Sequence, residues 1–206
     1  MYQYDNVCVT LRLTKTFISA LKGIFLRSNR EMVEYCGSSY FDGFKFVYPT
    51  CTTDQKPTSV TPAACDTHQY LVYHTHIVPH VLEGDIFTLP SRDDIELFLT
   101  YHPYLQQNLI LEKHGYYLID FMANGFSKPS VDDIMQTFEE LKRVGGLTQR
   151  EVRVGHSVYF LSDITEWKYA VGEMNKVLSK KHGMNMRYHA WDEMGTVTLY
   201  DHDFLT

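Results

Sequence analysis

The sequence has 206 residues, of which 44% are hydrophobic and 21% are charged, and its formal net charge is −6 at pH 7. This composition excludes a collagen-like, coiled-coil or disordered chain, and the length suffices for one domain with a substantial core. No apolar run approaches the ~18 residues of a membrane-spanning helix, so no membrane partner is expected. The acidic balance argues against nucleic acid as a partner. The first residues show no secretory signal pattern, which predicts an intracellular protein, cytoplasmic or nuclear.

Hydrophobic periodicity predicts helices and strands in a mixed α/β order without regular βαβ units. Strands are predicted at 7–14, 44–48, 69–76, 109–112, 116–121, 151–161 (as one or two strands) and 184–191. Helices are predicted at 15–27, 91–101, 128–143 and 162–183. The polar, proline-containing stretch 49–67 predicts a loop, and the last dozen residues are expected to be loosely structured.

Turn and capping residues set several of these boundaries. Gly115 is expected at the turn of a hairpin between the strands at 109–112 and 116–121. Ser130 and Asp133 form a plausible capping pair for the third helix. Ser162 is expected to cap the start of the last helix, and Gly183 its end.

A histidine pair carries the clearest chemical signal. His74 and His76 are two residues apart at the end of a predicted strand, so both imidazoles project from one face. Asp94 lies in the first turn of the next predicted helix, three residues after Ser91, where its carboxylate can supply a third ligand. Two imidazoles and a carboxylate suit zinc and leave a fourth position for water. Zinc would lower the pKa of that water toward ~7 and polarise a substrate carbonyl.

Hydrolysis at such a site needs a general base that is not itself a ligand. Glu34, in the segment VEYCGSSY just after the first predicted helix, can serve if a strand brings it beside the histidines. Each feature alone also has an ordinary structural explanation. Histidines on strands are common core or surface residues, and Ser91 with Asp94 is an ordinary helix cap. Their joint occurrence in this order favours a metal site.

In combination, these residues resemble the JAMM signature of the JAB/MPN metalloprotease family. The signature has a glutamate shortly before a small pair, here Glu34 before Cys36-Gly37, followed by His-x-His and Ser-x-x-Asp. The resemblance covers roughly residues 5–122 and includes the strand–helix opening, the PSRDD helix start and the LILEKHGYYLIDF hairpin. His76 and Asp94 are eighteen residues apart, which is longer than is usual in the family and predicts an insertion around VPHVLEG beside the cleft.

The resemblance implies a fold and a division of the chain. The expected fold is α/β, more specifically an α+β fold of the cytidine-deaminase-like, JAB/MPN type, with a mixed sheet flanked by helices and an α/β C-terminal extension. Residues 1–125 would form the metalloprotease domain. Residues 126–206 would form a helix and strand extension packed on it.

The resemblance also implies an activity: a deubiquitinase-like zinc metallopeptidase acting on isopeptide bonds. Zinc would be held by His74, His76 and Asp94. Glu34 would act as the base that activates the attacking water and then protonates the leaving amine. Ser91 would hydrogen-bond the tetrahedral intermediate or help to position the water. Ubiquitin or ubiquitin-like conjugates would be the substrates. The alternatives are a catalytically silent structural or interaction subunit and, less favoured, a hydrolase of small amides.

Other site hypotheses use different residues. A zinc site could be assembled from Cys51, Cys65 and His68, although their spacing matches no known pattern. A nucleophilic pair of Cys36 with His74 would need a lowered thiol pKa, which nothing in the sequence indicates. The nearest alternative ligands to the predicted set are Asp93, His80 and Asp85.

Overall fold

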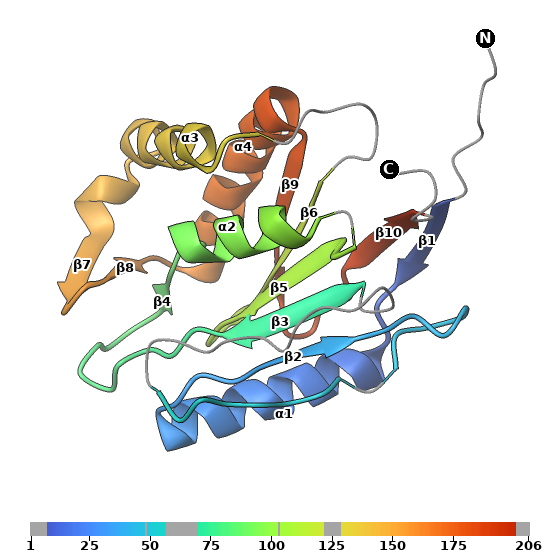
Figure 1. Cartoon of the computed structure of the whole chain (residues 1–206). Helices are drawn as coiled ribbons and strands as arrows, with labels where there is room; N and C mark the ends of the chain where they lie inside the picture. Colours follow the sequence, from blue (N-terminus) through green and yellow to red (C-terminus); the bar gives the residue numbers. More distant parts are fainter. Residues whose placement is uncertain (1–7, 48, 57–69, 103, 122–128, 201–206) are drawn as a thin grey trace, which may run out of the picture.

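The computed structural model describes residues 8–47, 49–56, 70–102, 104–121 and 129–200 (Figure 1). Cys65 and His68 of the alternative zinc hypothesis lie outside these ranges. The elements, in chain order, are β1 (Cys8–Arg12), α1 (Lys15–Glu31), β2 (Cys36–Ser39), β3 (Leu71–Thr75), β4 (Ile86–Phe87), α2 (Arg92–Tyr101), β5 (Gln107–Leu111), β6 (Gly115–Phe121), α3 (Val131–Val144), the 3₁₀ helix η1 (Leu147–Arg150), β7 (Glu151–Val154), β8 (Ser157–Leu161), α4 (Ile164–His182), β9 (Met184–Ala190) and β10 (Thr196–Tyr200).

A five-stranded mixed sheet forms the centre of the molecule, with the strand order β2-β3-β5-β6-β9. The β3–β5 pair is parallel, and the other three pairs are antiparallel. Helices cover both faces of the sheet: α1 lies on one side, and α2, α3 and α4 lie on the other (Figure 1). The chain therefore has the mixed α/β fold that its periodicity predicts, and the mixed sheet flanked by helices that was expected from the resemblance.

Alternating side chains along each strand divide the core into two layers. On the face covered by α1, buried residues of the helix such as Phe17 and Leu21 pack against Tyr73 and Leu109 of the sheet. The helix extends to Glu31, four residues beyond its predicted end, and stops where Met32 adopts a left-handed conformation with φ 55°.

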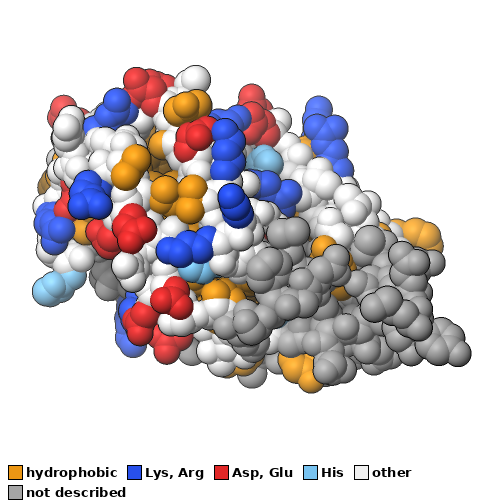
Figure 2. Space-filling view, turned by 90° about the horizontal axis from the view of Figure 1, so that it is seen from above, with side chains coloured by type: hydrophobic (Ala, Val, Ile, Leu, Met, Phe, Trp, Pro, Cys, Tyr) orange, Lys and Arg blue, Asp and Glu red, His pale blue; other side chains and the backbone are white. Residues whose placement is uncertain are grey.

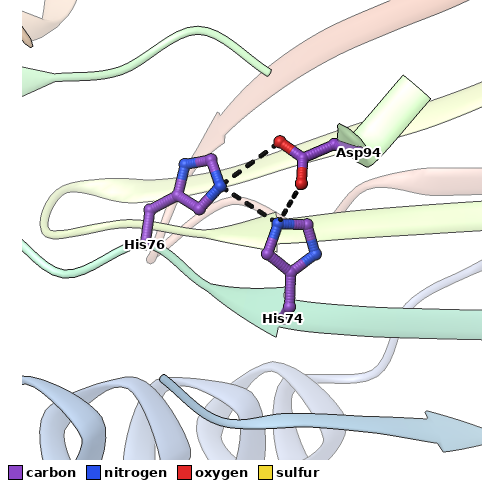
Figure 3. A group of neighbouring side chains, drawn as sticks. All are labelled: His74, His76 and Asp94. Carbon is purple, nitrogen blue, oxygen red and sulfur yellow. Dashed lines mark hydrogen bonds and ion pairs between the residues drawn. The ribbon is translucent and has the colours of Figure 1, made fainter. Parts of the chain in front are cut away.

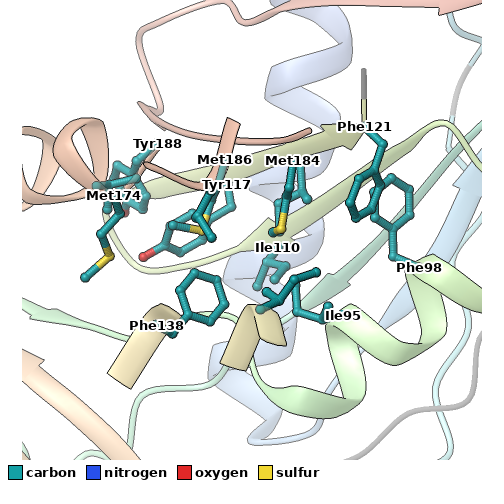
Figure 4. Packing of buried hydrophobic residues seen from close by; sticks show 14 of the residues in the cluster. Ile95, Phe98, Ile110, Tyr117, Phe121, Phe138, Met174, Met184, Met186 and Tyr188 are labelled. Carbon is teal, nitrogen blue, oxygen red and sulfur yellow. The ribbon is translucent and has the colours of Figure 1, made fainter. Parts of the chain in front are cut away.

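The face covered by α2, α3 and α4 has the larger cluster of buried residues. Figure 4 shows how aromatic and sulfur-containing side chains from these helices and from the sheet interdigitate there. Phe98 of α2 stacks on Phe121 of β6 with ring centroids 5.2 Å apart. The indole of Trp167 in α4 is fully buried and stacks on Phe87 of β4, with ring centroids 5.0 Å apart.

Residues 126–206 contribute strands to the same sheet system. Strand β9 pairs with β6 as the fifth strand of the central sheet, and β10 pairs with β1 at the other end of the chain. Strands β7 and β8 form a hairpin that adds β4 to a second sheet, in the order β4-β8-β7. The division of the chain at residue 125 stays a prediction.

The predicted β5–β6 hairpin is confirmed, and Gly115 closes its turn by accepting the N–H of Glu112 at 2.8 Å. Gly115 also has a role that was not expected. It is the first residue of β6, where it pairs with Ala190 of β9. A Cβ atom at this position would lie 2.0 Å from the carbonyl oxygen of His189. The absence of a side chain at Gly115 therefore allows β9 to approach the sheet closely.

Two predictions about strands are wrong: one predicted strand does not form, and one strand forms where loose structure was expected. At 44–48, the carboxylate of Asp42 accepts hydrogen bonds from the N–H groups of Phe44 and Lys45, both at 2.9 Å, and this Asx turn replaces the strand. Residue 48 lies outside the described residues. The final dozen residues are not uniformly loose, because 196–200 form β10. Its partner β1 is at the opposite end of the sequence, so no local pattern indicates the pairing.

Helix ends are predicted with mixed success. Gly183 ends α4 in a left-handed conformation, as expected. The start of α4 is capped by Asp163 rather than Ser162, because the Asp163 carboxylate accepts two backbone N–H groups of the first turn. Ser130 precedes α3 as expected, but no side-chain hydrogen bond caps that helix, so the Ser130–Asp133 pair does not act as predicted.

The surface over α2, α3 and α4 carries acidic and basic side chains interspersed with small hydrophobic areas (Figure 2). None of the described helices combines the length and apolar character needed to cross a bilayer.

We expect Trp167→Ala to lower the free energy of unfolding by about 3–5 kcal/mol, because it removes a fully buried indole. The matched control on the same helix is Tyr169→Ala, since Tyr169 is 71% exposed and its loss should change stability by less than about 0.5 kcal/mol. Urea unfolding followed by circular dichroism measures both values. Equal effects of the two substitutions would contradict the assigned packing of α4.

Candidate metal centre

The candidate metal centre lies where β3 ends, on the sheet face covered by α2. His74 is in β3, and His76 follows its last residue. Because their spacing is two, both side chains point to the same face as the buried Val72, toward α2. The backbone of His76 is still held by the sheet, since its N–H donates to the carbonyl of Leu111 at 2.9 Å. The predicted common face of the two histidines is therefore present.

The start of α2 brings Asp94 to the histidines (Figure 3). Ser91 caps the helix: its Oγ accepts the N–H of Asp94 at 3.2 Å, and its own N–H donates to Asp94 Oδ2 at 2.6 Å. This reciprocal capping box satisfies backbone donors of the first turn and fixes the Asp94 carboxylate. The ordinary helix-cap role of Ser91 and Asp94 is thus confirmed, and it coexists with the placement of Asp94 beside the histidines.

Three side chains converge on one point. His74 Nε2 lies 3.0 Å from His76 Nε2 and 2.9 Å from Asp94 Oδ1, and His76 Nε2 lies 3.4 Å from Asp94 Oδ2. Ligand atoms of a tetrahedral zinc ion, each about 2.0–2.1 Å from the metal, lie about 3.3 Å apart. The observed separations are close to that spacing. His74, His76 and Asp94 therefore form a group that could hold a metal ion and is compatible with zinc.

The three side chains are shielded but reachable. Their exposed fractions are 9% for His74, 15% for His76 and 12% for Asp94, so a bound ion would be largely removed from bulk water, while each side chain keeps some solvent contact. A donor set of two imidazoles and one carboxylate fits zinc by its chemistry as well as its spacing.

The electrostatics of the group favour a cation. Burial alone would lower the pKa of His76, but the carboxylates of Asp94, Glu112 and Glu34 outweigh it and raise this pKa to about 9. Burial opposes ionisation of Asp94, yet the two imidazoles and their hydrogen bonds hold its pKa well below the usual range. Three carboxylates therefore create a negative potential that in the metal-free protein retains a proton on His76.

Strand pairing also places Glu34 at this centre. In the antiparallel β2–β3 pair, Cys36 is opposite His74, so the same register carried two residues outward puts Glu34 opposite His76. The main chain of Glu34 is fixed by Lys56, whose carbonyl accepts its N–H at 2.9 Å. Burial raises the pKa of the Glu34 carboxyl, and the nearby imidazoles partly offset this. Glu34 thus interacts with the three candidate ligands without belonging to the ligand group.

The segment between His76 and α2 is tied to the C-terminal part of the chain. Its strand β4 pairs with β8, and the carbonyl of Asp85 accepts the N–H of Ser162 at 3.1 Å. Val78 and Ile86 pack against Tyr159 of β8 in a small apolar cluster. The predicted insertion is therefore an anchored structure beside the metal centre, and its effect on substrate access stays a prediction.

Three residues near the centre were missed by sequence reasoning. Thr88 Oγ1 lies 2.8 Å from His76 Nδ1, and Glu112 accepts two hydrogen bonds from Thr88. Burial raises the pKa of Tyr159, and the negative charge of the Glu34 carboxylate raises it further. Tyr159 therefore interacts electrostatically with Glu34. The sequence gives one indication of Glu112, which is a glutamate at the end of the apolar run LILE. Thr88 lies in a stretch without clear periodicity.

The other predicted site residues lie apart from this group. Asp93 and His80 are exposed, and Asp85 pairs with His114 at 3.3 Å. Among the described residues, only His74, His76 and Asp94 form such a cluster. Cys36 is buried opposite His74, and burial raises its thiol pKa, which disfavours the thiolate that a nucleophile requires.

No protein-family model, curated protein or solved structure matches this chain. The chemical interpretation of the centre therefore depends on its own residues and their geometry.

Protein purified without added metal should contain about one zinc ion per chain, and His74→Ala/His76→Ala should contain almost none, because two of three candidate ligands are lost. His80→Ala and Asp93→Asn are matched controls, since both residues are exposed neighbours outside the ligand group. Elemental analysis by mass spectrometry gives the stoichiometry. Equal zinc content in wild type and the double variant would contradict the assignment.

Zinc affinity should rise with pH, by about tenfold per unit between pH 6.5 and 8.5, and level off above pH 9. The reason is that the pKa of His76 is about 9, so binding below that pH displaces one proton from Nε2. Competition with a chelator at fixed free zinc measures the slope. An affinity independent of pH over this range would show that no ligand proton is displaced.

Proposed function

We propose that this chain is a zinc-dependent metallopeptidase of the JAB/MPN type that hydrolyses isopeptide or peptide bonds, with ubiquitin or ubiquitin-like conjugates as substrates. The observation that carries the proposal is the convergence of four side chains from three separate segments. His74, His76 and Asp94 surround one point, and Glu34 faces them. These are the residues, in the order, that the JAMM signature uses.

His74 Nε2, His76 Nε2 and the Asp94 carboxylate would hold the zinc ion. When bound, zinc lowers the pKa of a coordinated water toward ~7 and polarises the scissile carbonyl. The shielding of the three ligands strengthens these electrostatic effects, because bulk water screens them less.

Glu34 is the proposed general base. Its carboxylate takes a proton from the attacking water as the water oxygen bonds to the carbonyl carbon. It then gives that proton to the amine nitrogen as the C–N bond breaks, so Glu34 returns to its starting carboxylate form. A pKa raised by burial brings Glu34 nearer to the working pH, where one group can both accept and return a proton.

Ser91 has a proposed second role beyond the helix cap. Its Oγ accepts one backbone hydrogen bond, from Asp94, and this bond uses a lone pair and leaves the hydroxyl hydrogen available. Ser91 is exposed at the N-terminus of α2, where that hydrogen can reach a substrate oxygen on the open side of the centre. A donor there would stabilise the oxyanion of the tetrahedral intermediate.

The order of the helices and strands along the chain supports the proposal. A strand and helix precede the segment of Glu34, a buried strand carries the histidines, and the β5–β6 hairpin follows α2. This order agrees with the proposed JAB/MPN-type domain.

Glu34→Gln should retain zinc and lower the hydrolysis rate by at least about 100-fold, since it keeps the shape of the side chain and removes the base. Glu83→Gln is the matched control, because Glu83 is exposed in the neighbouring segment. Cleavage of a panel of ubiquitin and ubiquitin-like isopeptide conjugates by the zinc-loaded protein provides the measurement.

Full activity in Glu34→Gln would refute the mechanism. A zinc-loaded wild type that cleaves none of these conjugates would instead support the alternative of a catalytically silent structural or interaction subunit.

A further inference from the structure

A buried chain of hydrogen bonds leads from His76 of the candidate metal centre into the core. Glu112 follows the last residue of β5 with only 2% of its surface exposed, and Thr88 follows β4 with 8% exposed. The parallel register pairs Thr75 with Leu111, so the next residues, His76 and Glu112, are neighbours on the same face. The sheet therefore places a buried carboxylate beside one of the candidate metal ligands.

Thr88 connects the two residues. Its N–H donates to Glu112 Oε1 at 2.9 Å, its hydroxyl makes a short hydrogen bond to the same oxygen, and its Oγ1 lies 2.8 Å from His76 Nδ1. The carbonyl of Thr88 accepts the hydroxyl of Tyr117 at 2.6 Å, and that hydroxyl accepts the indole N–H of Trp167 at 3.0 Å. Every polar group of Thr88 is thus used.

The directions of these bonds are fixed by the donors and acceptors. Glu112 Oε1 already accepts the N–H of Thr88, so it also accepts the Thr88 hydroxyl. Since the Thr88 hydroxyl hydrogen is committed to Glu112, Oγ1 can only accept, and His76 Nδ1 must donate. Once Nε2 has lost its proton, as metal binding requires, the neutral imidazole carries its lone pair on Nε2, the atom facing His74 and Asp94.

We propose that Glu112, acting through Thr88, is a positioning residue that fixes His76 as the Nδ1–H tautomer and presents its Nε2 lone pair to the metal. The inference rests on the metal site of the proposed function but not on the peptidase activity. A carboxylate that orients a metal-bound histidine through its second nitrogen is a recurring feature of metal sites. Here a threonine hydroxyl stands between the two.

The first test uses zinc affinity, measured by chelator competition without any substrate. Thr88→Val keeps the shape of the side chain and removes the hydroxyl, and should weaken zinc binding by about 10–100-fold. Thr88→Ser restores the hydroxyl and should recover affinity to within about threefold of wild type.

The matched control is Thr137→Val, because Thr137 Oγ1 makes an equivalent 2.8 Å contact with His182 Nε2 between α3 and α4, away from the metal centre. It should leave zinc affinity unchanged. Equal zinc affinity in Thr88→Val and wild type would overturn the inference, as would a loss in Thr137→Val as large as in Thr88→Val.

The second test needs no variant at Thr88, so it holds even if Thr88→Val does not fold. Long-range ¹H–¹⁵N correlation spectra of the zinc-loaded wild type should show His76 protonated on Nδ1, with assignment by comparison with His76→Ala. Protonation on Nε2 would overturn the proposal.

The two proposals fail in different ways. Wild-type protein that binds no zinc would remove both. Protein that binds zinc through a correctly oriented His76 but hydrolyses nothing would refute only the peptidase.

Discussion

The pairing of β3 with its two neighbours is the constraint on which the candidate centre depends. Backbone hydrogen bonds tie β3 to antiparallel β2 on one side and to parallel β5 on the other. These two registers place Glu34 and Glu112 on either side of His76. Because side chains alternate along a strand, a slip of one residue would turn both histidines toward α1 and separate them from Asp94. The same apolar alternation that buries Tyr73 against α1 therefore maintains the site geometry.

Local features of the site were predictable from sequence because they depend on short spacings. A spacing of two between the histidines on a strand predicts a common face, and a spacing of three between Ser91 and Asp94 at a helix start favours a capping box. The same spacing does not guarantee a cap, because Ser130 and Asp133 form none. Glu112 and Thr88 could not be found this way. Their proximity to His76 follows from the β3–β5 register and from the anchoring of β4, which join distant segments.

The contrast between local patterns and contacts of distant segments also explains which strands and helices were predicted. The four helices and most central strands were found from periodicity, but β2 of the central sheet was not among the predicted strands. β10 was also missed, since among the described residues it pairs with the first strand of the chain. The C-terminal segment is linked to the metal centre as well as to the sheet. Trp167 of α4 contacts Phe87 of β4 and holds the hydroxyl of Tyr117, which in turn holds Thr88. Trp167, which is far from His76 in the sequence, thus helps to position Thr88 beside His76.

The β1–β10 ladder has a consequence for the connectivity of the chain. Cys8 pairs with Tyr200, so the backbone enters its first strand and leaves its last at adjacent points, at the edge of the molecule away from β4, β7 and β8 (Figure 1). A short linker joining these points, with new ends opened at the tight turn of Gly155 between β7 and β8, would give a circular permutant in which every sheet pairing is kept. The pairing of the first strand with the last therefore makes this fold a candidate for circular permutation.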